Sequence, residues 1–321
     1  NPAEMIGERP DIISFDIYKR LITDNSWLKA RSLMGYKNDF NKILMINIAG
    51  RPFINSRLSF NSFIPKSIPK KIELKLIKYW LRIFQQSPNL HDKIEFEIAI
   101  TSFDFFLPNR IKKIPNDILT MKEKNIVLKC YKDLTLDHIQ HNNFIDCKKS
   151  LSYLQNLDLN KNFDIKKLIK LLKNKGIIPF AIMARHAFIG QSFLKSFVKK
   201  KIFTPKQNEE FQRSINTVTK SFLEDMSKVS SGTLSKKDFM KIYGHLRPGT
   251  YDIKSKRYDQ MYNFAYKNNK IMHKKFNLNK NTENKIKLAL KKEKIKDLSP
   301  KQLLDYISES IEMREYSKFI F

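Results

Sequence analysis

The sequence predicts an α+β protein that is predominantly α-helical, with a small antiparallel sheet near the N-terminus followed by a large helical part. Three observations lead to this prediction. Two short β-like runs, 43–48 and 52–58, flank a glycine-containing turn, which is typical of a hairpin. Residues 93–100 alternate between polar and apolar side chains, which predicts a strand with one apolar face. After Phe106 apolar residues recur with helical spacing almost to the end of the chain.

The helical part divides into a series of candidate helices. Several begin at residues that favour a helix N-terminus, namely Asp164, Thr204-Pro205, Ser235 and Ser299-Pro300. Because the sequence changes character near residue 106, we expect the small α+β part and the helical part to be separate units. The expected helices span 69–86, 116–130, 145–157, 164–174, 181–200, 206–228, 235–243, 257–272, 282–293 and 299–318.

The chain of 321 residues carries a formal net charge of +29, and 41% of its residues are hydrophobic. This composition is typical of a globular protein, long enough for one large domain or two. Only 12 of the 61 basic residues are Arg, and the lysines are dispersed along the expected helices. Because a nucleic-acid-binding module clusters its Lys and Arg on one face, nucleic acid is the less favoured partner. The positive field still favours anionic ligands such as nucleotides and phosphates.

Several classes of protein find no support in the sequence. It contains no uninterrupted run of 18 apolar residues, so we expect no transmembrane helix, and it shows no signal-peptide pattern. Cys130 and Cys147 have neither CxxC spacing nor a ligand-like histidine partner nearby, so we expect a reducing, cytosolic setting with no disulfide scaffold and no zinc site. The motifs GxxxxGK[ST], HExxH, GxSxG and GxGxxG do not occur.

The stretch 243–260, YGHLRPGTYDIKSKRYDQ, concentrates polar side chains together with two of the eight glycines. Gly244 is placed to end a helix, and Pro248-Gly249 to form a turn. Arg247 can clamp a carboxylate or phosphate, and His245 can move a proton near neutral pH. A structural loop in which an Arg–Asp pair joins two helices is the alternative. The remaining candidates in this loop are Tyr251, Asp252 and Arg257.

Three further stretches carry candidate residues. Arg185-His186, in ARHAFIG, lies within a helix among apolar residues, where a core histidine and a polar cleft are both compatible with the pattern. Arg57 and Asn61 lie next to the small sheet, where they can meet a substrate. Glu95 and Glu97 share one face of the expected strand and can bind Mg²⁺ or an ammonium group. A solvated outer face is the alternative for these two carboxylates.

These motifs, taken in order, resemble the central portion of the phosphoenolpyruvate-synthase-like phosphotransferases. Within that family the chain is most similar to the branch that includes the L-glutamine kinase of bacterial capsule phosphoramidate biosynthesis. The resemblance spans nearly the whole chain. It rests on NPAEMIGERP, AGRPFIN, FNSFIP, LHDKIEFEIAI, ARHAFIG, YGHLRPGTYDIKSKRYD and REYSKF.

The resemblance implies a three-part cytoplasmic enzyme, of which this chain is one segment and is expected to be inactive alone. An ATP-grasp domain binds ATP and Mg²⁺, a swivelling domain carries a phosphohistidine, and a central domain couples the two and holds the acceptor. Residues 1–40 then form the C-terminal edge of the ATP-grasp domain with connecting helices. Residues 41–106 form a small α+β subdomain, and 107–321 the helical central, substrate-binding domain. Asn1 is then expected to be a Mg²⁺ ligand. None of the six histidines is a good candidate for the phosphorylated histidine.

The resemblance also gives the candidate residues their roles. His245 and Arg247 are expected to act in catalysis, facing the phosphohistidine of the missing domain. L-Glutamine requires an Arg for its carboxylate and an acidic residue for its ammonium, which Arg247 with Asp252, or Arg57 with Glu95, would supply. Pyruvate or another small acceptor on the same architecture is the first alternative, and a basic helical nucleic-acid-binding module is the second. The expected substrate-binding residues are Arg57, Asn61, Glu95, Arg185, His186, Tyr251, Asp252 and Arg257.

Overall fold

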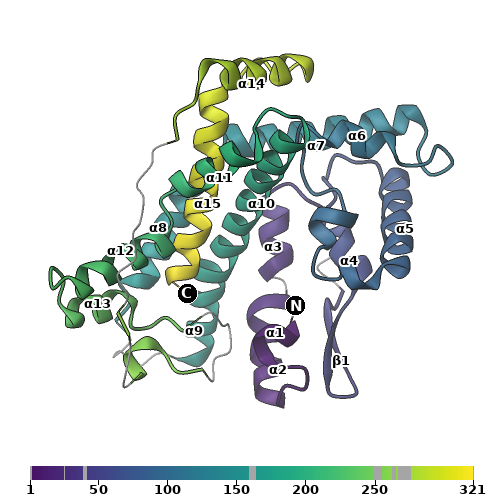
Figure 1. Cartoon of the computed structure of the whole chain (residues 1–321). Helices are drawn as coiled ribbons and strands as arrows, with labels where there is room; N and C mark the ends of the chain where they lie inside the picture. The colour runs from purple at the N-terminus through teal and green to yellow at the C-terminus, as the bar shows by residue number, and fades with distance from the viewer. Residues whose placement is uncertain are drawn as a thin grey trace.

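Helices make up most of the described chain, and a two-stranded antiparallel sheet lies near its N-terminus (Figure 1). The computed structural model describes residues 2–24, 26–38, 42–158, 164–248, 255–261, 265–266 and 276–320. The predicted fold class is confirmed. The elements of the N-terminal part are α1 Pro2–Ile6, α2 Ile12–Tyr18, the π-helical turn η1 Lys19–Thr23, α3 Ser26–Leu33, β1 Met45–Ile48, β2 Arg51–Ile54, α4 Ser56–Asn61, α5 Lys70–Gln86, the 3₁₀ turn η2 Pro88–Leu90 and the π-helical turn η3 Ile94–Ile98.

The remaining elements are helical throughout the described residues, and several begin at a capping residue. Thr120 begins the first long helix with a capping box, in which its hydroxyl accepts from Glu123 N and its own N–H donates to the Glu123 side chain. These elements are α6 Leu107–Lys112, α7 Met121–Gln140, α8 Phe144–Gln155, α9 Ile165–Leu172, the π-helical turn η4 Lys173–Ile177, α10 Ile178–Lys199, α11 Pro205–Ser214, α12 Val218–Ser230, α13 Lys236–Tyr243, the 3₁₀ turn η5 Tyr258–Gln260, α14 Lys280–Lys292 and α15 Pro300–Ile320.

The predicted hairpin is confirmed, although its second strand is shorter than expected. Ala49 and Gly50 form the turn with φ angles of 50° and 79°, and the Asn47 side chain accepts from Gly50 N at 2.9 Å. The second strand ends at Ile54 because Asn55 caps α4, its side-chain oxygen accepting from Leu58 N at 3.2 Å. Residues 56–58 are therefore helical.

The predicted strand at 93–100 is wrong, because residues 94–98 form the π-helical turn η3. Its main chain is satisfied internally, with Ala99 N donating to Ile94 O at 2.8 Å, so no neighbouring strand is needed. The alternating pattern has a different origin. Phe96 packs edge-on against Phe188 with ring centroids 5.3 Å apart, and Ile98 is buried.

Two predicted helices also differ from the structure. The expected helix 206–228 is divided into α11 and α12, because Thr217 starts a new helix by accepting from Lys220 N at 3.3 Å. The expected helix 257–272 is wrong over its first residues, where the described chain forms only the 3₁₀ turn η5. The other expected helices are present with shifted ends.

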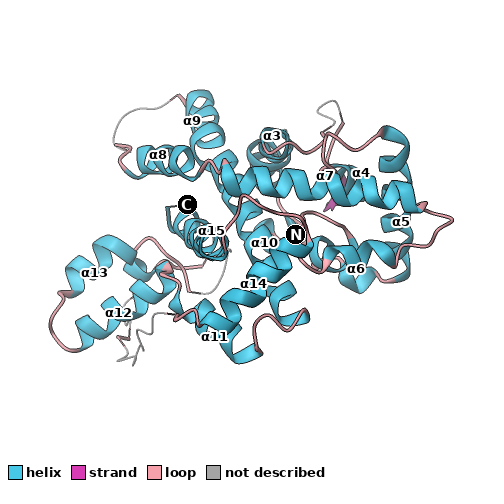
Figure 2. Ribbon diagram, turned by 90° about the horizontal axis from the view of Figure 1, so that it is seen from above, coloured by secondary structure: helices cyan, strands magenta, loops and turns pink. Residues whose placement is uncertain are grey.

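The core is centred on α10 and α15, which run side by side through the molecule (Figures 1 and 2). One buried apolar cluster includes Tyr36, Trp80, Phe103, Phe193 and Ile307, so its side chains come from both sides of residue 106. A second cluster, formed by Met226, Val229, Phe239 and Tyr243, joins α12 to α13 and is covered by Phe319 of α15. The end of α15 thus connects the main core to the α12–α13 hairpin.

The apolar segment Ile165–Lys199 satisfies the length and composition of a membrane span, but 67% of its most apolar window is buried inside the protein. Such burial is typical of a core helix in a soluble protein.

A close approach of α10 to α15 gives a stability prediction. A Cβ on Gly190 would lie 2.6 Å from Ser310 Oγ, which donates to Ile307 O at 2.9 Å. Gly190→Ala is therefore expected to lower the free energy of unfolding by about 1–2 kcal/mol in urea titrations, although Ala favours a helix. Adding Ser310→Ala should restore most of the loss. Equal stability of Gly190→Ala and the unmodified protein would show that the helices separate without cost.

Candidate functional site

Two buried arginines from different helices share one carboxylate. Arg31 of α3 donates from Nη2 to Glu95 Oε1 at 3.2 Å, and Arg185 of α10 donates from Nη2 to Glu95 Oε2. The side chains of Arg31 and Arg185 are 5% and 0% exposed, and that of Glu95 is 19% exposed. We call Arg31 and Arg185 the arginine pair. Because two guanidinium groups meet one carboxylate, the cluster has an excess of positive charge in the protein interior.

Aromatic rings hold the arginine pair in place. Cζ of Arg31 lies 4.9 Å from the ring centroid of Phe63, and Cζ of Arg185 lies 5.8 Å from the same centroid. Arg185 also packs over Phe188, at 5.2 Å. The faces of these rings attract the guanidinium groups. Because phenylalanine rings offer no oxygen or nitrogen acceptor, the N–H donors of the arginine pair need polar groups as hydrogen-bond partners.

Several donors of the arginine pair have no acceptor among the described residues. Arg31 Nη1 and both Nε and Nη1 of Arg185 are buried and make no hydrogen bond. Burial lowers the pKa of Arg31 to about 10, so Arg31 remains charged at neutral pH. Burial, followed by repulsion from Arg31, lowers the pKa of Arg185 well below its usual range. Unpaired buried donors are costly, and a carboxylate or phosphate would satisfy them.

His186, next to Arg185, is fully engaged inside the core. Its Nε2–H donates to the side-chain oxygen of Asn143 at 3.1 Å, and its Nδ1 accepts from the Tyr306 hydroxyl at 2.8 Å. Burial lowers its pKa well below the usual range, so the ring is neutral at neutral pH. These contacts join α10 to α15 and to the start of α8. They are the contacts of a core histidine, which was one of the two interpretations compatible with the sequence.

Asn61 and Arg57, both on α4, lie in different surroundings. Asn61 lines a cavity of about 300 Å³ together with Lys37, Lys66, Lys70 and Glu73, and its buried Oδ1 has no partner among the described residues. Arg57 is exposed. The suggested pairing of Arg57 with Glu95 is not formed, because Glu95 is bound by the arginine pair instead. Glu97 is exposed, and the two glutamates share no strand face.

The loop after α13 folds back on itself. Tyr258 N donates to Leu246 O at 2.9 Å and Asp259 N to Gly244 O at 3.1 Å. Gly244 ends α13 as predicted, but with a right-handed φ of −58°, and glycine is needed there because a Cβ would collide with Met240 O and approach Asp259. Leu246 packs against the second apolar cluster, so this loop lies with the α12–α13 hairpin.

The polar side chains of that loop already have partners within it or on α15. His245 is exposed, and its Nε2–H donates to Phe319 O at 2.8 Å. Arg247 Nε donates to Ser255 O at 2.9 Å, and Arg257 pairs with Asp259 at 2.6 Å. An Arg–Asp pair is thus present, although it lies within the loop instead of between two helices. Two predicted site residues of this loop, Tyr251 and Asp252, lie outside the described residues.

Arg31 was not predicted as a site residue. The signal was available in SWLKARSL, because Arg31 falls on the same helical face as Trp27, Leu28 and Met34. An arginine on an apolar helical face needs a buried counter-charge, and Glu95 supplies it.

Metal ligands are not evident in the part of the chain that the structure describes. No group of three or more His, Cys, Asp or Glu side chains there could hold a metal ion. Asn1, the predicted Mg²⁺ ligand, lies outside the described residues. Comparison with known proteins gives no match of this chain to a protein-family model, to a curated protein or to a solved structure.

Proposed function

We propose that this chain is the acceptor-binding and domain-coupling segment of an ATP-dependent cytoplasmic phosphotransferase. The phosphoryl group passes through a phosphohistidine on a separate domain, and L-glutamine is the acceptor. The observation that carries the proposal is the arginine pair, which presents unpaired buried donors around a single carboxylate. Phosphoryl transfer depends on positive charge and positioning more than on covalent chemistry by the protein, and such a cluster supplies both.

Glu95 is the group that ligand binding would displace. Its side chain is the most exposed of the three, so an incoming carboxylate reaches the arginine pair past it. The α-carboxylate of L-glutamine then takes the arginine donors bidentately. Glu95, released from one arginine, accepts from the ammonium group of the same molecule. ATP and Mg²⁺ are bound mainly by the flanking ATP-grasp domain, with Asn1 as the expected Mg²⁺ ligand from this chain.

Exposed apolar side chains near the N-terminus support the coupling role. On α2, Ile12 and Ile13 are 87% and 71% exposed, and Ile17 is half exposed. On the hairpin, Ile46 and Phe53 face each other across the strands and are also exposed. Large apolar side chains left exposed on neighbouring residues are expected where another domain packs. We assign this surface to the contact with the rest of the ATP-grasp domain, whose C-terminal edge residues 1–40 are expected to form.

The test uses the full-length enzyme and measures the phosphorylated acceptor. Arg185→Lys keeps the charge but loses the planar fork, and should reduce transfer to L-glutamine at least about tenfold, chiefly through KM. Arg213→Lys is the matched control, because the Arg213 side chain is exposed, and it should leave the rate unchanged. Phosphorylation of pyruvate instead of L-glutamine would show that pyruvate is the acceptor. Equal effects of the two variants would contradict the role of the arginine pair.

A further inference from the structure

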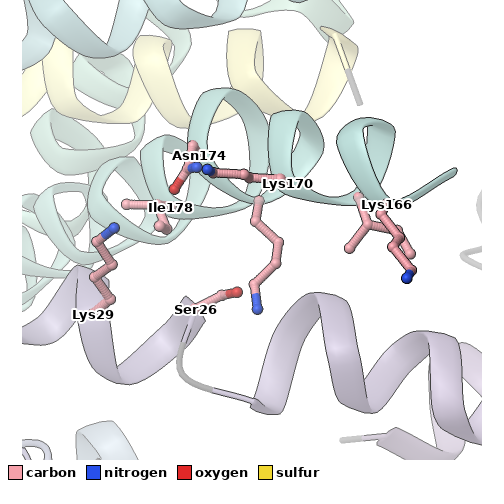
Figure 3. Close-up of a pocket in the computed structure, with 8 residues that line it drawn as sticks. Ser26, Lys29, Lys166, Lys170, Asn174 and Ile178 are labelled. Atoms are coloured by element: carbon pink, nitrogen blue, oxygen red, sulfur yellow. The ribbon is translucent and has the colours of Figure 1, made fainter. Parts of the chain in front are cut away.

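A second basic site lies between α3 and the segment formed by α9, η4 and α10 (Figure 3). It is a pocket of about 380 Å³ that none of the predicted site residues lines. Figure 3 shows Ser26 and Lys29 on one wall, with Lys166, Lys170 and Asn174 on the opposite helical wall. We call it the lysine pocket. Its lining residues are Ser26, Lys29, Lys166, Ile169, Lys170, Lys173, Asn174 and Ile178.

The lining of the lysine pocket has one sign of charge. It includes four lysines and no acidic side chain. Lys173 donates to the main-chain oxygen of Asp24 at 3.0 Å, which fixes it at the edge of the pocket. The nearby Asp24 carboxylate is bound by Lys19 at 2.9 Å. Among the described residues, Lys29, Lys166 and Lys170 form no ion pair, so their charges repel one another across the pocket.

Ser26 gives the pocket a buried donor that lacks a partner. It is the first residue of α3 and is 1% exposed, yet its Oγ makes no hydrogen bond among the described residues. Its hydroxyl points into the space between the two walls (Figure 3). Buried hydroxyls are almost always hydrogen-bonded, so this one indicates a missing acceptor. The N-terminus of α3 lies at the same place and adds a positive partial charge.

We propose that the lysine pocket binds a small molecule that carries linked phosphate groups. Phosphate oxygens accept from the Ser26 hydroxyl and from the first turn of α3, while the lysines on both walls neutralise the remaining charge. Four cations match a multivalent anion better than a single carboxylate, and the volume suffices for a small phosphorylated compound. The site does not depend on the phosphotransferase role, because the arginine pair is made of other side chains.

Calorimetry of the intact chain with pyrophosphate tests the site at an ionic strength of about 0.15 M, where diffuse attraction is screened. The unmodified protein should bind one pyrophosphate. Ser26→Ala should weaken binding about three- to tenfold, and Lys170→Glu at least about tenfold. Lys167→Glu is the matched control, because Lys167 is exposed on the same helix and does not line the pocket. It should change the dissociation constant less than about twofold.

Two results would overturn the proposal. One is the absence of pyrophosphate binding to the unmodified protein. The other is an equal loss in Lys167→Glu and Lys170→Glu, which would assign the binding to the overall charge of +29. Circular dichroism of each variant verifies folding, and Lys166→Glu replaces Lys170→Glu if the latter does not fold. Arg185→Lys should leave pyrophosphate binding intact, which separates failure of this site from failure of the proposed function.

Discussion

Glu95→Gln is expected to lower the free energy of unfolding by about 3 kcal/mol, because it leaves the buried arginine pair without a counter-charge. Both arginine side chains are almost completely buried, and Glu95 is the carboxylate that contacts them. Repulsion between two buried cations adds to the lost hydrogen bonds. Urea unfolding at neutral pH measures the loss. The loss in the free energy of unfolding should stay below about 5 kcal/mol, because Glu95 retains some contact with solvent.

Glu97→Gln is the control for Glu95→Gln. Glu97 lies two residues away in the same π-helical turn and is exposed, so its substitution should change stability by less than about 0.5 kcal/mol. The Glu95→Gln variant also tests anion binding. If the arginine pair accepts an anion in place of Glu95, phosphate should raise the melting temperature of Glu95→Gln more than that of Glu97→Gln. A stable Glu95→Gln protein that no anion stabilises further would contradict this account of the cluster.

The partners of Glu95 illustrate how far sequence could take the site. Arg185 and Glu95 were both predicted as substrate-binding residues, and the structure brings them together. Their contact joins residues 90 positions apart, which no local pattern reveals. The alternation at 93–100 predicted a strand, but residues 94–98 form a π-helical turn in which Ile94, Glu95 and Phe96 are all half-buried. Period alone does not distinguish the two when the run is only one or two turns long.

Features set by neighbouring residues were predicted more successfully. The hairpin depends on a turn whose residues adopt positive φ, and helix starts at Asp164, Thr204 and Ser235 depend on caps within three residues. Those signals are local, so sequence carries them. The lysine pocket and the arginine pair depend instead on α3 meeting α10. The sequence of neither helix indicates that it packs against the other.

His138 gives the second large prediction, which concerns acid. Its ring is buried against His186, with centroids 5.6 Å apart, and against Tyr36, at 6.0 Å. Burial lowers the pKa of His138 to about 4, although Asp137 and the main chain of Met34 favour the charged form. In the unfolded chain the ordinary value of 6.5 applies. Between these two values the unfolded state binds more protons, so stability is present above pH 6.5 and is lost as the pH falls.

For His138 alone this linkage lowers the free energy of unfolding by about 2 kcal/mol between about pH 7.5 and about pH 5. His186, whose pKa is also lowered by burial, acts in the same direction. His138→Gln keeps an amide donor for Met34 but cannot titrate, so its stability should fall less over that range in urea unfolding.

His141→Gln is the matched control, because His141 lies at the end of the same helix and its side chain is exposed. The unmodified protein and His138→Gln should therefore diverge in stability as the pH falls through 6.5, whatever constant offset the substitution introduces. Parallel pH profiles for the two would mean that His138 becomes protonated inside the fold. Its buried Nε2, which has no acceptor among the described residues, would then have gained one.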